Sequence, residues 1–374
     1  MKTKIYIDGS EGTTGLRIFE RMAGRDDIEL LTIDPALRKD ANERRKLINA
    51  SDITFLCLPD AAAKEAVSLI DNDSTRIFDR LANREDIQLL TIDPALRKDP
   101  AERAKLINAS DITFLCLPDA AAREAVSLID NDHTRVIDAS TAHRTAPGWA
   151  YGFPELSIAH REAVASGKRI ANPGCHATGF ISIAYPLVAA GVVASNEQLT
   201  CFSLTGYSGG GKKMIAQYED DGRDAALDSP RPYGLTQQHK HLPEMQKIAG
   251  LQKPPVFTPI VADYYAGMLV GVPLTADQLQ GVKTLAGLHE CLSDAYAGQK
   301  LVRVLPLSAQ ADVGGFLAAC ARSGWDGLEI IVTGNDERMI VFARFDNLGK
   351  GASGAAIQSM NLMIGCDEAK GLNI

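Results

Sequence analysis

The chain has 374 residues, of which 45% are hydrophobic and 23% charged, and its formal net charge is −8. This composition is typical of a globular protein with room for two or three domains. The acidic balance argues against nucleic acid or an anionic membrane as the main partner. No apolar run approaches the roughly 18 residues of a membrane-spanning helix, and the first residues do not resemble a signal peptide, so the expected location is the cytoplasm.

The N-terminal part alternates strands with helices. The short apolar strand KIYIDG is followed by a helix with Leu16, Phe19 and Met22 available for one face. A second strand, IELLTID, a polar helix and the buried-type strand ITFLCLP come next. Since strands that alternate with helices form βαβ units, the sequence predicts an α/β fold that begins with a doubly wound, Rossmann-like parallel sheet.

Most of this part then occurs a second time. Asp27–Asp73 and Asp86–Asp132 align without a gap at an offset of 59, and only positions 29, 41, 42, 45 and 64 differ from their partners. The wider matched region pairs 18–79 with 77–138. We expect one copy to supply strands two and three of the parallel sheet. The other should be an extra β-α-β-α piece at the sheet edge or outside it, or a piece exchanged between chains in a swapped dimer.

The composition changes after Thr141. Glycine and proline become frequent, and strands such as LTCFSLTGYSG and GLEIIVTGNDERMIVFARFDN indicate a mixed sheet in a second, α+β domain. The stretch ASGAAIQSMNLMIG is typical of a closing helix. We therefore expect domains at 1–174 and 175–345, with 346–374 returning to the first domain.

The loop GSEGTTG has Gly9, Gly12 and Gly15 at G-x-x-G-x-x-G spacing, between a strand and a helix. This is the context of a dinucleotide-binding fingerprint, because glycines let the backbone approach a pyrophosphate and the helix N-terminus supplies amide donors. A plain glycine-rich turn is the alternative interpretation.

A second cofactor cue lies after strand two. Asp34 could bind a ribose 2′-hydroxyl, whereas Arg38 and Lys39 could meet a 2′-phosphate. The competing interpretation is a capped, solvated helix start. The second copy repeats the same set as Asp93, Arg97 and Lys98.

The stretch ANPGCHATG places Cys175 after Pro-Gly at an expected helix N-terminus. The helix dipole would stabilise its thiolate, which could attack an acyl carbon and form a thioester. A structural cysteine is the alternative. The chain has no C-x-x-C pair among its seven cysteines, so neither a zinc signature nor a disulfide framework is predicted.

The stretch QHKHLPEM holds His239, His241 and Glu244. A histidine near the thiolate could serve as acid and base, and Glu244 could orient one ring. A zinc site built from H-x-H and a carboxylate is the rival interpretation. Since no third histidine or cysteine accompanies them locally, we predict no metal site.

Two further stretches could contact a substrate. The run from Ser208 to Lys212, which includes Gly209, suits an oxyanion or phosphate cradle, or else forms a flexible hairpin. The stretch DASTAHR places Ser140, Thr141 and Arg144 where a parallel strand ends, which is where ligands bind in open α/β sheets. Arg144 could pair with a carboxylate or phosphate there, or form a surface ion pair.

Together these motifs resemble the N-acetyl-gamma-glutamyl-phosphate reductase family, specifically its shorter, second type. The matching stretches span nearly the whole chain in family order: IDGSEGTTGLRI, IDASTAHRTAPGWAYGFPEL, NPGCHATGF, GYSGGGKKMIAQYE, HKHLPEM and FDNLGKGASGAAIQSMNLMIG. The resemblance implies reduction of N-acetyl-glutamyl 5-phosphate by NADPH to the 5-semialdehyde and phosphate, in arginine biosynthesis. It also implies a homo-oligomer, either a dimer or a tetramer.

The resemblance assigns roles to individual residues. Cys175 would be the nucleophile that carries the acyl group as a thioester, and His239 or His241 the acid and base. The NADP-binding domain would be 1–174, and the NADP(H) contacts would come from Gly9, Gly12, Thr13, Thr14, Gly15, Arg38, Asn347, Lys350 and Gly351. The substrate contacts would come from Ser140, Thr141, Arg144, Ser208, Gly209, Lys212 and Glu244.

The repeat is a departure from the family, whose members of this type are expected to be shorter by one copy. The first copy is expected at the adenosine ribose, because it follows the glycine loop directly and loop-closure entropy favours local pairing. Two alternatives stay open at this point. One is an aspartate-semialdehyde-type dehydrogenase, and the other is a relative whose activity is impaired by the duplication.

Overall fold

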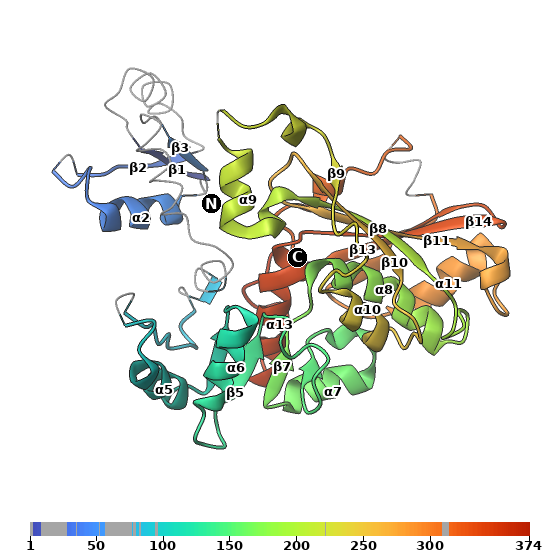
Figure 1. Ribbon diagram of the computed structural model, residues 1–374, viewed down its shortest axis with the longest axis horizontal. Helices are drawn as coiled ribbons and strands as arrows, with labels where there is room; N and C mark the ends of the chain where they lie inside the picture. Colours follow the sequence, from blue (N-terminus) through green and yellow to red (C-terminus); the bar gives the residue numbers. More distant parts are fainter. Residues whose placement is uncertain are drawn as a thin grey trace. The chain divides into compact units, whose positions relative to one another are not determined.

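The computed structural model describes residues 3–8, 28–34, 36–51, 53–56, 77, 80–81, 84–93, 96–220, 222–308 and 314–374 (Figure 1). The chain divides into two compact units, Met1–Thr75 and Arg76–Ile374. The expected cofactor residues of the glycine loop lie outside the described residues: Gly9, Gly12, Thr13, Thr14 and Gly15.

The first unit contains a three-stranded parallel sheet. Its strands β1 (Thr3–Asp8), β2 (Ile28–Leu31) and β3 (Ile53–Leu56) lie in the order β2-β1-β3. Helix α2 (Ala41–Ala50) starts at Asp40, whose carboxylate accepts two backbone N–H groups of the first turn. A small apolar cluster centred on Tyr6 joins the sheet to the helix. The first copy of the repeat therefore supplies both neighbours of β1.

The second unit begins with the second copy and contains a four-stranded parallel sheet in the order β4-β5-β7-β6. The strands are β4 (Ile112–Leu115), β5 (Arg135–Asp138), β6 (Ala150–Tyr151) and β7 (Arg169–Ala171). The helices α5 (Pro100–Ala109), α6 (Asp119–Ser127), α7 (Ile158–Ser166) and α13 (Gly354–Met363) accompany it. Because the four strands are parallel, their carboxyl ends meet at one edge of the sheet.

A seven-stranded mixed sheet forms the rest of the second unit, in the order β12-β13-β14-β11-β8-β10-β9 (Figure 1). Its strands are β8 (Thr200–Gly206), β9 (Arg231–Pro232), β10 (Val256–Ala262), β11 (Met268–Thr275), β12 (Val302–Val304), β13 (Leu328–Gly334) and β14 (Arg338–Phe345). The helices are α8 (Cys175–Ala189), α9 (Gly211–Tyr218), α10 (Leu242–Ile248) and α11 (Leu285–Ala295).

Short helical turns join these elements. They are η1 (Pro154–Leu156), η2 (Tyr207–Gly210), η3 (Ala225–Asp228), η4 (Ala276–Gln278), η5 (Ala319–Arg322) and the π-helical η6 (Gly349–Ser353). The main core lies between the mixed sheet and α8, which buries Phe180 and Ile181 against this sheet. This packing fixes the position of the first residue of α8, Cys175.

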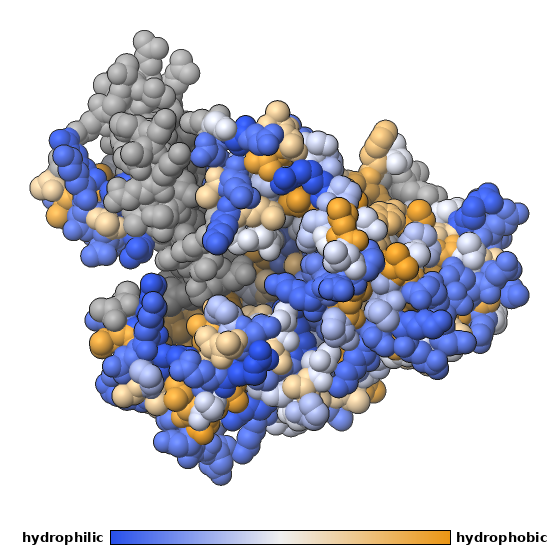
Figure 2. All heavy atoms as spheres, viewed as in Figure 1, coloured by the Kyte–Doolittle hydropathy of each residue, from blue (hydrophilic) through white to orange (hydrophobic). Residues whose placement is uncertain are grey.

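The described surface is largely hydrophilic on the face in view (Figure 2). Hydrophilic side chains predominate on the face shown in Figure 2, and hydrophobic ones are interspersed in smaller groups. Among the helices that are described, none combines the length and the apolar character needed to cross a bilayer.

The predicted fold class, a Rossmann-like parallel sheet with a mixed-sheet α+β part, is confirmed. The parallel strands, however, form two sheets in two units. The reason is that the sequence ITFL occurs twice, so that β1 pairs with the first copy as β3 and β5 pairs with the second copy as β4. The expected domain boundaries at 174 and 345 stay predictions.

The second copy is anchored to the C-terminal part of its unit. Ile77 and Leu81 belong to a buried cluster with residues of α13. The Arg80 guanidinium lies 2.7 Å from the buried carboxylate of Asp326, and Arg84 donates to the side-chain oxygen of Asn361 at 2.6 Å. These contacts make the second copy part of the folded body of unit two.

The two copies carry matched helix caps. Asp99 caps α5 with the same pair of N–H contacts that Asp40 makes in α2. Substituting Asp99 by Ala should lower the free energy of opening α5 by about 1 kcal/mol, because two N–H groups lose their acceptor. Hydrogen exchange measures this, since differences at positions 41, 42 and 45 distinguish peptides of the two helices by mass.

The matched variant, Asp40→Ala, should speed exchange in α2 and leave α5 unchanged. Equal acceleration of both helices by either variant would contradict separate capping of the two copies.

Candidate active site

Cys175 is the first residue of α8, and Gly174 is its N-cap. The helix follows β7 after the three residues Asn172, Pro173 and Gly174. At this position the thiol lies at the positive end of the helix dipole, which stabilises a thiolate. A Cβ placed on Gly351 would lie only 3.1 Å from the Cys175 Cβ. The turn η6 therefore packs directly against the cysteine.

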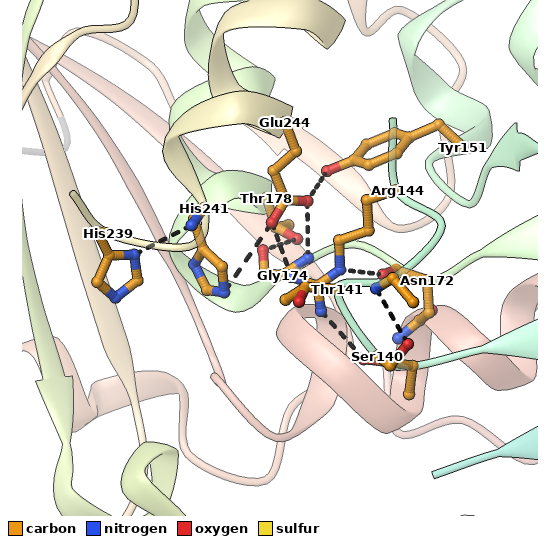
Figure 3. Close-up of polar contacts among 12 residues, drawn as sticks. Ser140, Thr141, Arg144, Tyr151, Asn172, Gly174, Thr178, His239, His241 and Glu244 are labelled. Atoms are coloured by element: carbon orange, nitrogen blue, oxygen red, sulfur yellow. Dashed lines mark hydrogen bonds and ion pairs between the residues drawn. The ribbon is translucent and has the colours of Figure 1, made fainter. Parts of the chain in front are cut away.

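An ion pair between Arg144 and Glu244 lies beside Gly174 (Figure 3). The Arg144 guanidinium donates to one Glu244 carboxylate oxygen at 2.7 Å. The other oxygen accepts from the Tyr151 hydroxyl at 2.9 Å and from the Gly174 N–H at 3.2 Å. Burial raises the pKa of Glu244, although Arg144 and the hydrogen bonds oppose this shift. Because both oxygens are engaged within the protein, the contacts of Glu244 indicate that it supports the site.

The remaining nitrogens of Arg144 join two strand ends. Its Nε donates to the carbonyl of Asn172, after β7, and its Nη2 donates to the carbonyl of Ala139, after β5. The guanidinium therefore holds the carboxyl ends of two parallel strands against the residue that precedes Cys175.

Three histidines cluster on the other side of Gly174. The ring centroids of His239 and His241 lie 4.8 Å apart, and each lies 5.5 Å from the ring of His176. His241 Nε2 would lie 2.6 Å from a Cβ on Gly174, so this ring contacts the segment that enters α8. The structure thus brings His239, His241 and Glu244 close to the start of α8, as the sequence predicts.

Burial keeps these histidines neutral near pH 7. It lowers the pKa of His176 to about 3 and that of His239 to about 4, and the pKa of His241 falls well below its ordinary value. The charges of Arg144 and Lys240 lower the pKa of His241 further. A neutral imidazole has a ring nitrogen free to accept a proton, and the lowered pKa makes it a weaker base than an exposed histidine. In the part of the chain that the structure describes, no three His, Cys, Asp or Glu side chains are placed to hold a metal ion.

Three residues of the site are absent from the sequence-based prediction, namely His176, Tyr233 and Tyr151. His176 bonds to Ser203 through Nδ1 and to the Tyr233 hydroxyl through Nε2, each at 2.7 Å. The sequence signal for His176 was its position next to Cys175. Tyr233 lies outside the motif stretches, and Tyr151 lies in IDASTAHRTAPGWAYGFPEL without having been a candidate, so the tertiary structure identifies both.

Ser140 and Thr141 lie at the carboxyl end of β5, as predicted. The Ser140 hydroxyl donates to Asp138 at 2.7 Å, and the Thr141 hydroxyl donates to Asp119 at the start of α6. Both hydroxyl hydrogens are therefore engaged, and a ligand could only use the oxygens as acceptors.

The glycine run and Asn347 also come together. The Asn347 side chain donates to Ser208 Oγ at 3.0 Å and accepts from the backbone N–H of Gly267 at 2.8 Å. A Cβ built on Gly209 would lie 3.6 Å from the side-chain nitrogen of Asn347. Lys212 lies in α9, directly after this turn.

Two predicted cofactor residues have other surroundings. The Lys350 ammonium is buried and bonds to Glu155 and Gln358. Burial lowers the pKa of Lys350. These contacts indicate a structural role. Arg38 lies in the first unit, exposed in the turn before α2, and its contact with a cofactor stays a prediction.

Comparison with known proteins identifies the family. Residues 91–166 match the family described as "Semialdehyde dehydrogenase, NAD binding domain", and residues 175–347 match "Semialdehyde dehydrogenase, dimerisation domain". "N-acetyl-gamma-glutamyl-phosphate reductase 2" of Nostoc sp. is 44% identical over 99% of both chains. The protein named N-acetyl-gamma-glutamyl-phosphate reductase in Sinorhizobium medicae is 39% identical over 97% of this chain and 99% of its own.

The chain belongs to the N-acetyl-gamma-glutamyl-phosphate reductase family. The prediction of an oxidoreductase that uses a nicotinamide dinucleotide is thereby confirmed. The match to the NAD-binding description starts at residue 91, inside the second copy of the repeat.

Solved structures show the same fold at low identity. An aspartate semialdehyde dehydrogenase from Francisella tularensis superposes with a TM-score of 0.56 at 14% identity, over 97% of this chain and 100% of that chain. Aspartate semialdehyde dehydrogenase II from Vibrio cholerae superposes with a TM-score of 0.54 at 13% identity, over 97% of this chain and 99% of that chain. These likenesses support a fold in which a Rossmann-like parallel part is followed by a mixed sheet.

The buried histidines predict a pH dependence of stability. In the folded chain His176 and His241 stay neutral, whereas in the unfolded chain each takes up a proton below about pH 6.5. The unfolded state then binds more protons, so the free energy of unfolding should fall between pH 6.5 and 4, by about 1.4 kcal/mol per pH unit for each histidine. Urea denaturation at several pH values measures this slope.

Replacing His241 by Gln should remove the contribution of His241 to the change of the unfolding free energy with pH, because Gln does not titrate. The exposed His133 provides the control, since His133→Gln should leave the slope unchanged. Equal slopes in the wild type and the His241→Gln variant would refute the buried neutral state of His241.

Proposed function

We propose that this chain reduces an N-acetyl-glutamyl 5-phosphate to the 5-semialdehyde, with release of phosphate, as the relatives' names indicate for those proteins. The observation that carries this proposal is Cys175 at the N-terminus of α8, with His241 Nε2 against the preceding residue, Gly174. An acyl phosphate is already activated, so a thiolate nucleophile and a hydride donor suffice for its reduction.

The reaction begins on Cys175. Its proton passes to a neutral imidazole, for which we favour His241, because its Nε2 lies against Gly174, the residue before the nucleophile. The thiolate sulfur then bonds to the acyl carbon while the bond from that carbon to the phosphate oxygen breaks. The products of this half-reaction are inorganic phosphate and a thioester on Cys175.

When bound, NADPH would supply a hydride to the thioester carbon, and Cys175 would then leave as a thiolate as the aldehyde forms. The site fits such a cofactor, because Asn172 Oδ1 is buried at the carboxyl edge of the parallel strands and has no hydrogen-bond partner among the described residues. An amide-bearing ligand could donate to this oxygen. The glycine-loop residues and Arg38 stay the sequence-based candidates for the cofactor phosphates.

We expect substrate groups to contact two sets of polar residues. One set is Thr141 and Ser140 at the end of β5, and the other is Ser208, Gly209 and Lys212 at the start of α9. Arg144 and Glu244 act as positioning residues in this proposal, since their polar atoms hold Gly174 and the two strand ends.

We also assign the chain to the shorter, second type of the family and expect a homo-oligomer, as the dimerisation-domain match suggests. The length of the relative from Chelativorans sp. supports the assignment to the shorter type. Its aligned 289 positions make up 92% of its own chain, so it is shorter than the present chain by roughly one copy of the repeat.

The thioester step can be tested without cofactor. Mixing the enzyme with the acyl phosphate alone should release one equivalent of phosphate and leave an acyl adduct on Cys175, detectable by mass spectrometry of the intact chain. Cys175→Ser should abolish both the phosphate burst and aldehyde formation. The exposed Cys320 gives the matched control, because Cys320→Ser should leave both unchanged. A burst that survives in Cys175→Ser would exclude the thioester mechanism.

The two histidines of the H-x-H stretch can be separated by variants. His241→Asn should lower the rate of the phosphate burst by roughly 10²–10⁴-fold, the usual range for losing a general base. His239→Asn should have a smaller effect, because its ring lies farther from Gly174 and is only half-buried. The opposite order would assign the proton transfer to His239.

A further inference from the structure

The substrate of the proposed function carries a second anionic group besides its phosphate. This inference rests on that function, in which an N-acetyl-glutamyl 5-phosphate keeps its free α-carboxylate throughout the reaction. Arg144 offers no free fork for this carboxylate, because its three nitrogens bond to Glu244 and to the carbonyls that follow β5 and β7. A carboxylate that leaves water needs hydrogen-bond donors, and a guanidinium matches its geometry. Another arginine of the mixed-sheet part is therefore the candidate.

Arg231 lies on the same face of the mixed sheet as the active site. In β9 it pairs with Val261 of β10, and Tyr233 continues this pairing by donating its N–H to the carbonyl of Pro259. Since alternate residues of a strand share a face, the side chains of Arg231 and Tyr233 point to the same side. On that side the Tyr233 hydroxyl bonds to His176 at 2.7 Å.

Two further observations place this face close to the nucleophile. Burial raises the pKa of Tyr233, and a thiolate at Cys175 raises it further, so the two side chains are close enough to interact. Phe257 of β10 lies on the same face, and its ring centroid is 5.3 Å from that of His176. Arg231 therefore follows Tyr233 along the wall that begins at Cys175.

An aromatic side chain holds the guanidinium of Arg231. Its Nη2 donates to the Tyr218 hydroxyl at 3.0 Å, and its central carbon lies 5.4 Å from the centroid of the Tyr218 ring. Tyr218 is buried and stacks on Tyr207, with ring centroids 4.7 Å apart. Tyr233 packs against the same apolar cluster. The guanidinium is thus oriented before a ligand binds, which reduces the entropy lost on binding.

In the described part of the chain, no carboxylate neutralises this guanidinium. The buried Nε of Arg231 has no acceptor there, and its hydrogen bond to Tyr218 involves a neutral hydroxyl. Arg223, which also bonds to Tyr218, differs because it pairs with Asp228 and Asp263. A buried charged donor without an acceptor is destabilising. The contrast indicates that Arg231 receives its anion from outside the chain.

We propose that Arg231 binds the α-carboxylate of the acyl phosphate and selects substrates that carry this group. The acyl carbon reaches Cys175 while the carboxylate pairs with the guanidinium, so that the two contacts fix both ends of the glutamyl chain. A carboxylate oxygen supplies the acceptor that Nε lacks. Such a charge-assisted contact contributes to binding and also orients the acyl carbon.

The reaction run in reverse, from aldehyde, NADP and phosphate, tests this role with two probes. One is N-acetyl-glutamate 5-semialdehyde, and the other is 4-acetamidobutanal, the same aldehyde without the carboxylate. Arg231→Met should lower kcat/KM for the first by roughly 10–100-fold, mainly through KM, because a charged hydrogen-bond contact is lost. It should leave kcat/KM for 4-acetamidobutanal unchanged, which also shows that the variant is folded.

Two matched variants complete the comparison. Arg223→Met should keep the wild-type preference for the carboxylated aldehyde, since Arg223 is already paired within the chain. Arg231→Lys should recover part of the preference, because lysine restores the charge without the planar fork. An equal loss on both aldehydes in Arg231→Met would indicate a structural role and overturn the proposal. So would a preference that Arg231→Met keeps and that Lys240→Met abolishes, because the exposed Lys240 would then bind the carboxylate.

The results separate this inference from the proposed function. A wild type that converts neither aldehyde would overturn the proposed function. A wild type that converts the carboxylated aldehyde, with a preference that Arg231→Met leaves intact, would overturn the role of Arg231 alone.

Discussion

The ion pair of Arg144 with Glu244 is the interaction on which the active site depends. Arg144 binds the carbonyls that follow β5 and β7, and Glu244 binds the N–H of Gly174. Both side chains are nearly excluded from solvent, so removing either one would leave a buried charge without its partner, which is strongly destabilising. The pair therefore connects the ends of the parallel strands to α10 and to the first turn of α8, and it sets the position of Cys175.

The chemistry of the site follows from the position of Cys175 and the burial of the histidines. Cys175 lies at the positive end of a helix dipole, and the nearby histidines are neutral because burial disfavours their charged form. A thiolate and an imidazole that can accept its proton are what acyl transfer requires. Glu244 and Tyr151 hold this arrangement through their hydrogen bonds with each other, with Arg144 and with the Gly174 N–H.

Much of the site could be predicted from the sequence. Strand–helix alternation indicated the parallel sheet, and the stretch ANPGCHATG placed Cys175 after Pro-Gly at a helix start, where α8 begins. The same reasoning could not separate a substrate-binding Glu244 from a supporting one, nor a cofactor-binding Lys350 from a buried one. Burial and hydrogen-bond partners decide these roles, and the deciding partners are a hundred or more positions away in the chain, such as Arg144 for Glu244 and Glu155 for Lys350.

The repeat gives the clearest division between sequence and tertiary structure. Local sequence by itself determined α2 and α5, because Asp40 and Asp99 cap the same helix in both copies, and a cap acts through neighbouring N–H groups. It also determined the strand ITFL in both copies. The segment Ile28–Leu31 forms a strand, whereas Ile87–Leu90, which differs from it only in Gln88 for Glu29, does not. Only pairing with β1 decided this difference, since a strand obtains its hydrogen bonds from a neighbour that its own sequence does not supply.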